Sequence, residues 1–196
     1  DGNGSNSGHV RVFEYSGGTW SQLGSDIDGE TSNDQSGYWQ GLSINAAGTR
    51  VAVGAWQNDG GGSDAGHVRI YEYSGSSWSQ LGSDIDGTDI GDLSSYKIDL
   101  SDDGNTVGIG SIKHDASGND AGQVRIFNFD EQKNIWRQSG FDLLGTESNE
   151  NFGSALSFSS DSETIAISSI NGGENNFGEV NFYDLKSKIM SCKACR

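Results

Sequence analysis

Apolar and polar positions alternate with a period of two along much of the chain. In HVRIYEY (residues 67–73), Val68 and Ile70 point to one face of an extended segment, and the residues between them point to the other. The preceding run RVAVGA (residues 50–55) carries the β-branched residues that are typical of a buried strand. No segment shows a convincing helical period. The pattern therefore predicts an all-β chain built of short strands.

The same strand pattern recurs along the chain. GHVRVFEYSGGTWSQLGSDIDG begins at Gly8 and returns almost unchanged from Gly66, and shorter relatives begin at Gly122 and Gly178, at spacings of 58, 56 and 56 residues. Between these copies lies a second repeated unit, which reads SGYWQGLSINAAGTRVAVGA from Ser36. Together the two units give four short strands, A to D, in each repeat. Four antiparallel strands recurring at a fixed period predict the blades of a β-propeller.

The repeats divide the chain into about three and a half blades. Such an array cannot close a ring, so we expect either further blades of the same protein or a second copy of the chain to complete it. The last segment contains two cysteines, Cys192 and Cys195, whose C-x-x-C spacing has no second pair to complete a zinc site. The predicted units are residues 1–29 as a half blade with strands C and D, 30–87 and 88–145 as blades, 146–185 as an incomplete blade, and 186–196 as a basic cysteine-containing tail.

Two dipeptides resemble a known repeat family. Phe152-Gly153 opens a strand A, and Gly54-Ala55 closes a strand B, as in the FG-GAP repeats of integrin α-subunit propellers and of many secreted surface proteins. The proline of GAP is absent, and Trp56 stands in its place. The resemblance implies an adhesion or recognition propeller. It also implies calcium loops in the A–B hairpins, but these hairpins hold too few carboxylates here to surround a calcium ion.

The charge of the chain narrows the choice of partners. Twelve lysines and arginines stand against 28 aspartates and glutamates, which gives a formal net charge of -16. This charge repels the phosphates of nucleic acids, so we expect no nucleic-acid partner. No apolar run is long enough for membrane insertion.

The acidic residues gather in two families of segments, the B–C loops and the D–A connections. Strands in a meander alternate in direction, so these two families lie on one face of the array. Aspartates recur there by position, and clustered carboxylates with loop carbonyls favour calcium. Duplication of solvated acidic loops explains the same recurrence without a metal. The candidate calcium ligands are Asp26, Asp28, Asp59, Asp64, Asp84, Asp86, Asp115 and Asp120.

These features favour an extracellular adhesion or recognition module, secreted or displayed at the cell surface, that binds a protein or glycan on its acidic face. We expect no enzyme, because catalytic pairs are singular whereas these acids repeat, and no serine lies in a nucleophile elbow. A propeller hydrolase or lyase acting on polysaccharide and a structural spacer are the alternatives. Tryptophans recur at the start of strand D and are expected to pack against the blade edge: Trp20, Trp78 and Trp136.

Overall fold

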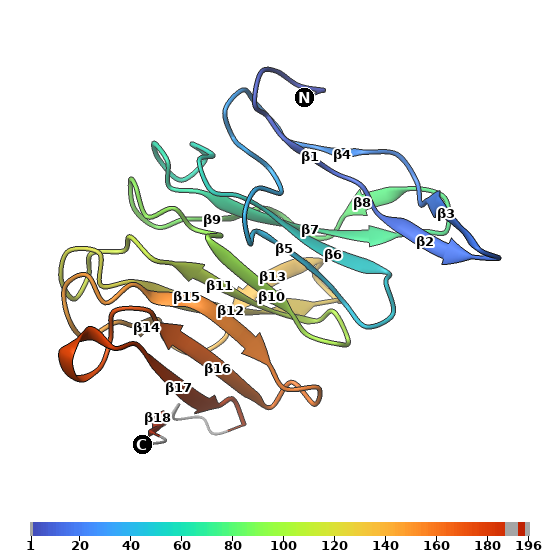
Figure 1. Ribbon diagram of the computed structural model, residues 1–196. Coiled ribbons are helices and arrows are strands. Elements are labelled where there is room, and N and C mark those ends of the chain that lie inside the picture. Colours follow the sequence, from blue (N-terminus) through green and yellow to red (C-terminus); the bar gives the residue numbers. More distant parts are fainter. Residues whose placement is uncertain (1, 187–191, 195–196) are drawn as a thin grey trace.

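The chain folds into a succession of antiparallel β-sheets, as the computed structural model in Figure 1 shows. The structure describes residues 2–186 and 192–194. Among them the one helical segment is a single 3-10 turn, η1 (Glu174–Asn176), and no helix has the length and apolar content needed to cross a membrane. The predicted all-β class is confirmed, and the sheets follow one another along the array from the N-terminal to the C-terminal end.

The first unit, counted as the first sheet below, consists of two separate two-stranded pairings and is only half as wide as the sheets that follow. Strand β1 (His9–Val10) pairs with β4 (Ile27–Asp28), and β2 (Phe13–Ser16) pairs with β3 (Thr19–Gln22). These strands are the predicted strands C and D, and no described residue pairs with the other edge of β1 and β2.

The second and third sheets have all four predicted strands. The second contains β5 (Leu42–Ile44), β6 (Arg50–Ala55), β7 (His67–Tyr73), β8 (Trp78–Gln80) and β9 (Ile85–Asp86). The third contains β10 (Lys97–Leu100), β11 (Thr106–Ser111), β12 (Gln123–Asp130), β13 (Ile135–Gln138) and β14 (Leu143–Leu144). In each sheet the first four strands lie side by side in chain order, and the short fifth strand, β9 or β14, pairs with the third strand, β7 or β12.

In the first three units the chain returns to the sheet after the outer strand, within the segment expected to be the D–A connection. In the second sheet, β9 pairs with the start of β7 through His67 and Val68. The reason is the apolar side chain of Ile85, which is buried. Asp84 and Asp86 therefore flank a sheet residue on the outer strand instead of lying in a free loop.

The fourth sheet contains β15 (Phe152–Phe158), β16 (Thr164–Ser169), β17 (Glu179–Asp184) and β18 (Cys192–Ala194). Strand β18 pairs with β17 as a fourth strand, which the sequence left doubtful. The remainder of the predicted tail, including Cys195, lies outside the described residues.

Neighbouring sheets pack face to face, and the core lies between them. Val68 and Ile70 of the second sheet contact Ile98 and Ile109 of the third in one fully buried cluster. Two tryptophans tie the sheets together from the outer edge: the indole N–H of Trp78 donates to the Leu23 carbonyl at 2.7 Å, and that of Trp136 donates to the Leu81 carbonyl at 2.8 Å. The predicted packing role of these two residues is confirmed.

Candidate functional site

The two loop families that hold most of the acids lie against each other, as predicted. In the second repeat, backbone N–H groups of the D–A connection donate to carbonyls of the B–C loop, from Gly91 to Ser63 at 2.9 Å and from Ser94 to Ala65 at 2.9 Å. The other repeats use equivalent bonds, such as Asn149 to Asn119 at 2.7 Å. These ladders fix a single loop face at one end of the sheets.

Two of the predicted calcium ligands are held by arginines of the adjacent strand. The Asp26 carboxylate accepts hydrogen bonds from Arg11 at 2.7 and 2.9 Å, and these bonds, together with one from Gln22, lower the pKa of Asp26 to about 2. Partial burial alone would raise the pKa of Asp84, but hydrogen bonds from Arg69 and Gln80 outweigh it, and its pKa is lowered. Each of these carboxylates already has a cationic partner.

The other predicted ligands lie in separate places on the loop face. Asp59 accepts the backbone N–H of Asp64 at 2.9 Å, and Asp115 accepts that of Asp120 at 2.8 Å, so both side chains close their own loops. The carboxylate of Asp120 is also bonded to Lys113 at 2.5 Å. Asp28 and Asp86 are exposed at the ends of β4 and β9. The structure therefore does not bring the eight aspartates into one site.

Acidic residues and histidines do form two groups that could hold a metal ion among the described residues. The first consists of Glu30, His67 and Asp84. The guanidinium of Arg69 contacts both carboxylates of this group, at 2.9 Å for Asp84. Since the Arg69 guanidinium already bonds to both carboxylates, a metal ion would compete with Arg69 for them.

His67 is buried at the centre of this group. Its imidazole is 3% exposed, and its Nδ1 has no hydrogen-bond partner while lying 3.7 Å from both Glu30 Oε2 and Asp84 Oδ2. Burial, with the nearby charge of Arg69, lowers the pKa of His67. Burial therefore favours the neutral form of the imidazole, although two carboxylates face it.

A histidine with a lowered pKa makes the fold sensitive to mild acid. The unfolded chain binds the proton more readily than the folded one, so this contribution to stability is complete above a pH of about 6.5 and is lost as the pH falls below it. We expect the Tm of the wild type to fall by a few degrees between about pH 7.5 and 5.5. In His67→Gln the Tm should fall less; glutamine is chosen because Gln123 holds the equivalent position in the next repeat. Differential scanning fluorimetry measures both. His9→Gln, at the exposed equivalent position, serves as the control, and an equal fall in all three proteins would contradict the assignment.

The second group contains Asp89, Asp92 and a histidine that the sequence analysis did not single out, His114. His114 Nδ1 lies 3.0 Å from Asp92 Oδ2, and its Nε2 lies 3.4 Å from the side-chain nitrogen of Gln123. Both His114 and Asp92 are buried. With both ring nitrogens engaged, this pair joins the loops of two successive repeats.

An aromatic cluster occupies the loop face beside the innermost strands of the second and third sheets. It comprises Tyr38, Trp39, Trp56 and Tyr96. The rings of Tyr38 and Trp56 are stacked at 6.1 Å, and that of Trp39 lies 5.7 Å from Tyr96 and 6.5 Å from Trp56. With Ser95, the four rings line a small cavity of about 40 Å³. The sequence analysis did not identify this cluster.

The cluster depends on a short insertion that occurs in one repeat. Ser36 and Ser94 make equivalent backbone hydrogen bonds and are 58 residues apart. Further along, the cross-strand pair Ile44–Val51 corresponds to the pair Leu100–Val107, and each residue is only 56 positions from its equivalent. The two extra residues form a turn closed by a bond from the Gly41 N–H to the Tyr38 carbonyl at 3.1 Å. The same register aligns Ser36 and Ser94 with Phe152, since the three backbone N–H groups donate to equivalent carbonyls.

Trp39 lies at the tip of this turn. Its φ of 54° falls in the left-handed region, which a bulky residue rarely adopts, and its side chain is 63% exposed. Polar side chains border the cluster: the Trp56 indole donates to Gln35 at 3.3 Å, Gln35 is bonded to Gln57, and Gln57 donates to Asp64 at 3.4 Å. The arrangement is an exposed aromatic surface with amide and carboxylate groups at its rim.

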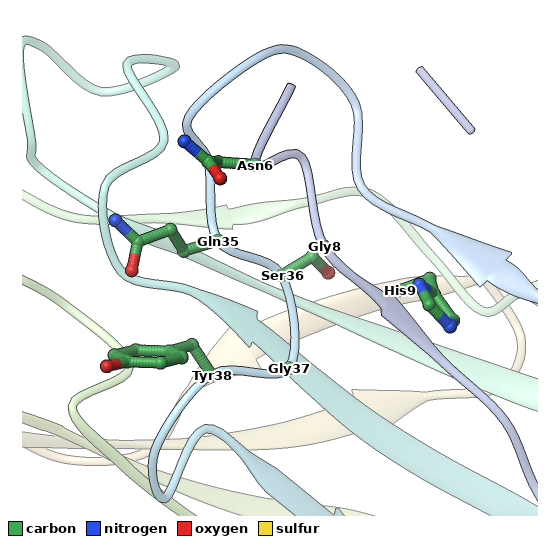
Figure 2. A pocket seen from close by; sticks show the side chains of 7 residues that line it. All are labelled: Asn6, Gly8, His9, Gln35, Ser36, Gly37 and Tyr38. Carbon is green, nitrogen blue, oxygen red and sulfur yellow. The ribbon is translucent and has the colours of Figure 1, made fainter. Parts of the chain in front are cut away.

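A larger cavity of about 460 Å³ lies next to the cluster and shares Tyr38 with it. Figure 2 shows its lining, with Gly8 and Ser36 on two adjacent chain segments and the Asn6, Gln35 and Tyr38 side chains extending from them. The equivalent space in the following repeats is filled: Gly54 of β6 packs against Ser95, and Gly110 of β11 against Gly153. In the following repeats the equivalent place is thus occupied by a glycine of the inner strand.

Comparison with known proteins places the chain in a class of fold. No protein family matches the sequence, and no curated protein matches it. Among solved structures, a putative 6-phosphogluconolactonase from Bacteroides uniformis ATCC 8492 is similar, with a TM-score of 0.63 and 10% identity over 95% of this chain and 48% of that chain. The tricorn protease aligns with a TM-score of 0.48 and 11% identity over 92% of this chain and 16% of that chain.

The fold is thus all-β and β-propeller-like, with antiparallel sheets that follow one another along the chain. This chain spans about half the length of the lactonase-like structure. At 10% identity the likeness concerns the fold alone and carries no activity over to this chain.

Proposed function

We propose that the chain is a recognition module that binds a glycan through the aromatic cluster on its loop face. The observation that carries this proposal is Trp39, which is held in a left-handed conformation at the tip of a turn that the other repeats do without. A bulky residue held in a left-handed backbone conformation costs stability, and such residues cluster at ligand-binding sites. Sugar rings stack their C–H faces on indole rings while their hydroxyls bond to surrounding amides and carboxylates.

The geometry of the cluster suits this ligand class better than a protein surface would. The exposed area is a few rings wide, and Gln35, Gln57 and Asp64 form a connected polar rim beside it. A rim of hydrogen-bonding groups around an aromatic surface matches a sugar, which has an apolar face and a polar circumference.

Replacing Trp39 with alanine is expected to weaken glycan binding at least about tenfold, because the stacking surface is removed. A glycan array would identify the ligand, and calorimetry with that ligand would measure the affinity. Phe141→Ala is the matched control, since Phe141 is 89% exposed and lies outside the cluster. Equal affinity of the Trp39 variant and the wild type, or no glycan bound on the array, would contradict the proposal.

The module is proposed to bind without catalysis, in contrast to the alternative of a propeller hydrolase or lyase. Support comes from the histidines: His67 is enclosed by Glu30, Asp84 and Arg69, and both nitrogens of His114 face side-chain partners. The same array glycans, incubated with the protein and assayed for new reducing ends or unsaturated products, test this point. Release of product would favour the enzyme.

An extracellular or cell-surface setting, with an FG-GAP-like repeat origin, fits this role and remains part of the proposal. Calcium on the loop face is a separate element of it, supported by the net charge of -16 and by carboxylates clustered in neighbouring loops. If calcium binds the folded state, its addition to chelator-treated protein raises the Tm by a few degrees. A Tm that is the same with calcium and with chelator would remove calcium from the proposal and leave the glycan site untouched.

A further inference from the structure

The small cavity inside the aromatic cluster contains a polar group that has no role in the fold. The cavity, of about 40 Å³, is lined by four aromatic rings and Ser95. Ser95 is only 2% exposed, and its hydroxyl oxygen has no hydrogen-bond partner among the described residues. A buried hydroxyl without a partner costs stability, so a ligand group that bonds to it relieves that cost.

Ser95 stands where the equivalent residues of two other repeats are glycines. Its backbone φ is 81°, and Gly37 and Gly153 at the equivalent positions have φ values of 76° and 89°. Glycine adopts this left-handed conformation without strain, whereas serine does not. The serine therefore strains the backbone, and what it adds is a hydroxyl group beside the four rings.

The inserted turn of the second repeat closes the cavity over this serine. Gly41 of the turn lies so near that a Cβ there would be 3.2 Å from the Ser95 carbonyl oxygen. Trp39, at the tip of the turn, is itself in a left-handed conformation, with a φ of 54°. Two strained residues, one from each of two successive repeats, thus meet at the same cavity.

The size and the lining of the cavity fit a small apolar group that carries one hydrogen-bond acceptor. Its 40 Å³ exceed the roughly 10–15 Å³ that one water molecule needs, and they are too few for a sugar ring. The aromatic walls favour a methyl group, and the Ser95 hydroxyl can donate to one carbonyl oxygen. An acetyl group has both. A hydroxymethyl group fits less well, because it has no methyl group for the rings and its own O–H needs a second partner.

We propose that the glycan contains an N-acetylated amino sugar, whose acetamido group enters this cavity while its ring stacks on Trp39. The acetyl methyl packs against the aromatic walls, and the acetyl oxygen accepts the Ser95 O–H. This inference rests on the proposed glycan site and adds the feature by which that site selects its sugar. A plain hydroxyl in place of the acetamido group leaves the cavity unfilled and Ser95 without a partner.

A glycan array with matched pairs tests the acetamido group separately from the glycan site. Suitable pairs are triacetylchitotriose with cellotriose and N-acetyllactosamine with lactose, which differ only in acetamido against hydroxyl groups. We expect the bound glycans to be N-acetylated, and calorimetry to give at least about tenfold weaker binding of the hydroxyl partner. Equal binding within pairs would overturn the acetamido assignment and leave the glycan site standing. An array without any bound glycan would overturn both.

Variants of Ser95 test the cavity itself. Ser95→Ala removes one oxygen atom and is expected to weaken binding of the N-acetylated glycan at least about tenfold, with no change for its hydroxyl partner. Ser95→Gly, the residue of the equivalent positions, lacks the same oxygen without backbone strain, so it should lose affinity equally while its Tm does not fall. Ser79→Ala, on the exposed outer strand β8, is the matched control. Unchanged selectivity in both Ser95 variants would overturn the proposal.

Discussion

Replacing Gly87 with alanine is expected to lower the free energy of unfolding by about 3 kcal/mol and the Tm by about 10 °C. Gly87 follows β9, and its N–H donates to the Gly66 carbonyl at 2.7 Å. A Cβ at this position would overlap the carbonyl oxygen of Ala65, which belongs to the backbone and cannot swing aside. The outer strand would have to separate from β7, and the buried Ile85 would move with it.

The chain repeats this constraint and also provides a control. Gly29 and Gly145 occupy the equivalent positions, and a Cβ there would meet the carbonyls of Ser7 and Ala121. Gly108 is a contrasting case, because its equivalents are Ala52 and Ala166 and its Cβ would approach only side-chain atoms: the methyl groups of Ile165 and Leu156 at 3.2 Å and the ring of Phe158 at 3.3 Å. Urea unfolding followed by tryptophan fluorescence measures both variants. A loss below about 1 kcal/mol in Gly87→Ala, or an equal loss in Gly108→Ala, would show that the backbone contact is not the cause.

The fold could be predicted from the sequence because its information is local and repeated. Alternation in HVRIYEY and in its copies sets both the strand and the buried face, and the fixed period assigns each copy to the same place in a sheet. The end of the outer strand was missed for a physical reason. Aspartates on both sides of Ile85 look like a polar loop, whereas burial of one apolar side chain is enough to return the chain to the sheet.

The candidate site could be predicted only in part. Recurrence of the acids located the loop face correctly, but it could not distinguish Asp84, which pairs with Arg69, from a ligand, because the arginine lies 15 residues away on the neighbouring strand. The aromatic cluster could have been suspected from the sequence, because the spacing between equivalent residues of the second and third repeats changes from 58 to 56 within the repeat. Trp56 and Tyr96 joined it only in three dimensions, since they come from different repeats.

The buried carboxylates of the D–A connections illustrate how a recurring acid can serve the fold. Asp34, Asp92 and Glu150 hold equivalent positions and are all nearly inaccessible. Each accepts a backbone N–H from the start of its own connection, as Asp92 does from Asp89 at 3.0 Å. Each also accepts a side chain from the neighbouring repeat: Asn58 for Asp34, His114 for Asp92 and Ser169 for Glu150. A carboxylate that satisfies donors from two repeats fixes the connection in place.

Replacing Asp92 with alanine is accordingly expected to lower the free energy of unfolding by about 3 kcal/mol, because the Asp89 N–H, the Thr88 hydroxyl and the His114 ring lose their shared acceptor inside the protein. Asp89→Ala is the control: Asp89 lies 3.9 Å from His114 with its side chain 72% exposed, so a loss within about 0.5 kcal/mol is expected. Urea unfolding in the presence of chelator distinguishes the two explanations of this group. If Asp89, Asp92 and His114 held a metal ion, chelator would destabilise the wild type and both substitutions would abolish that effect. If Asp92 acts through its hydrogen bonds, the cost of its replacement is the same with and without chelator.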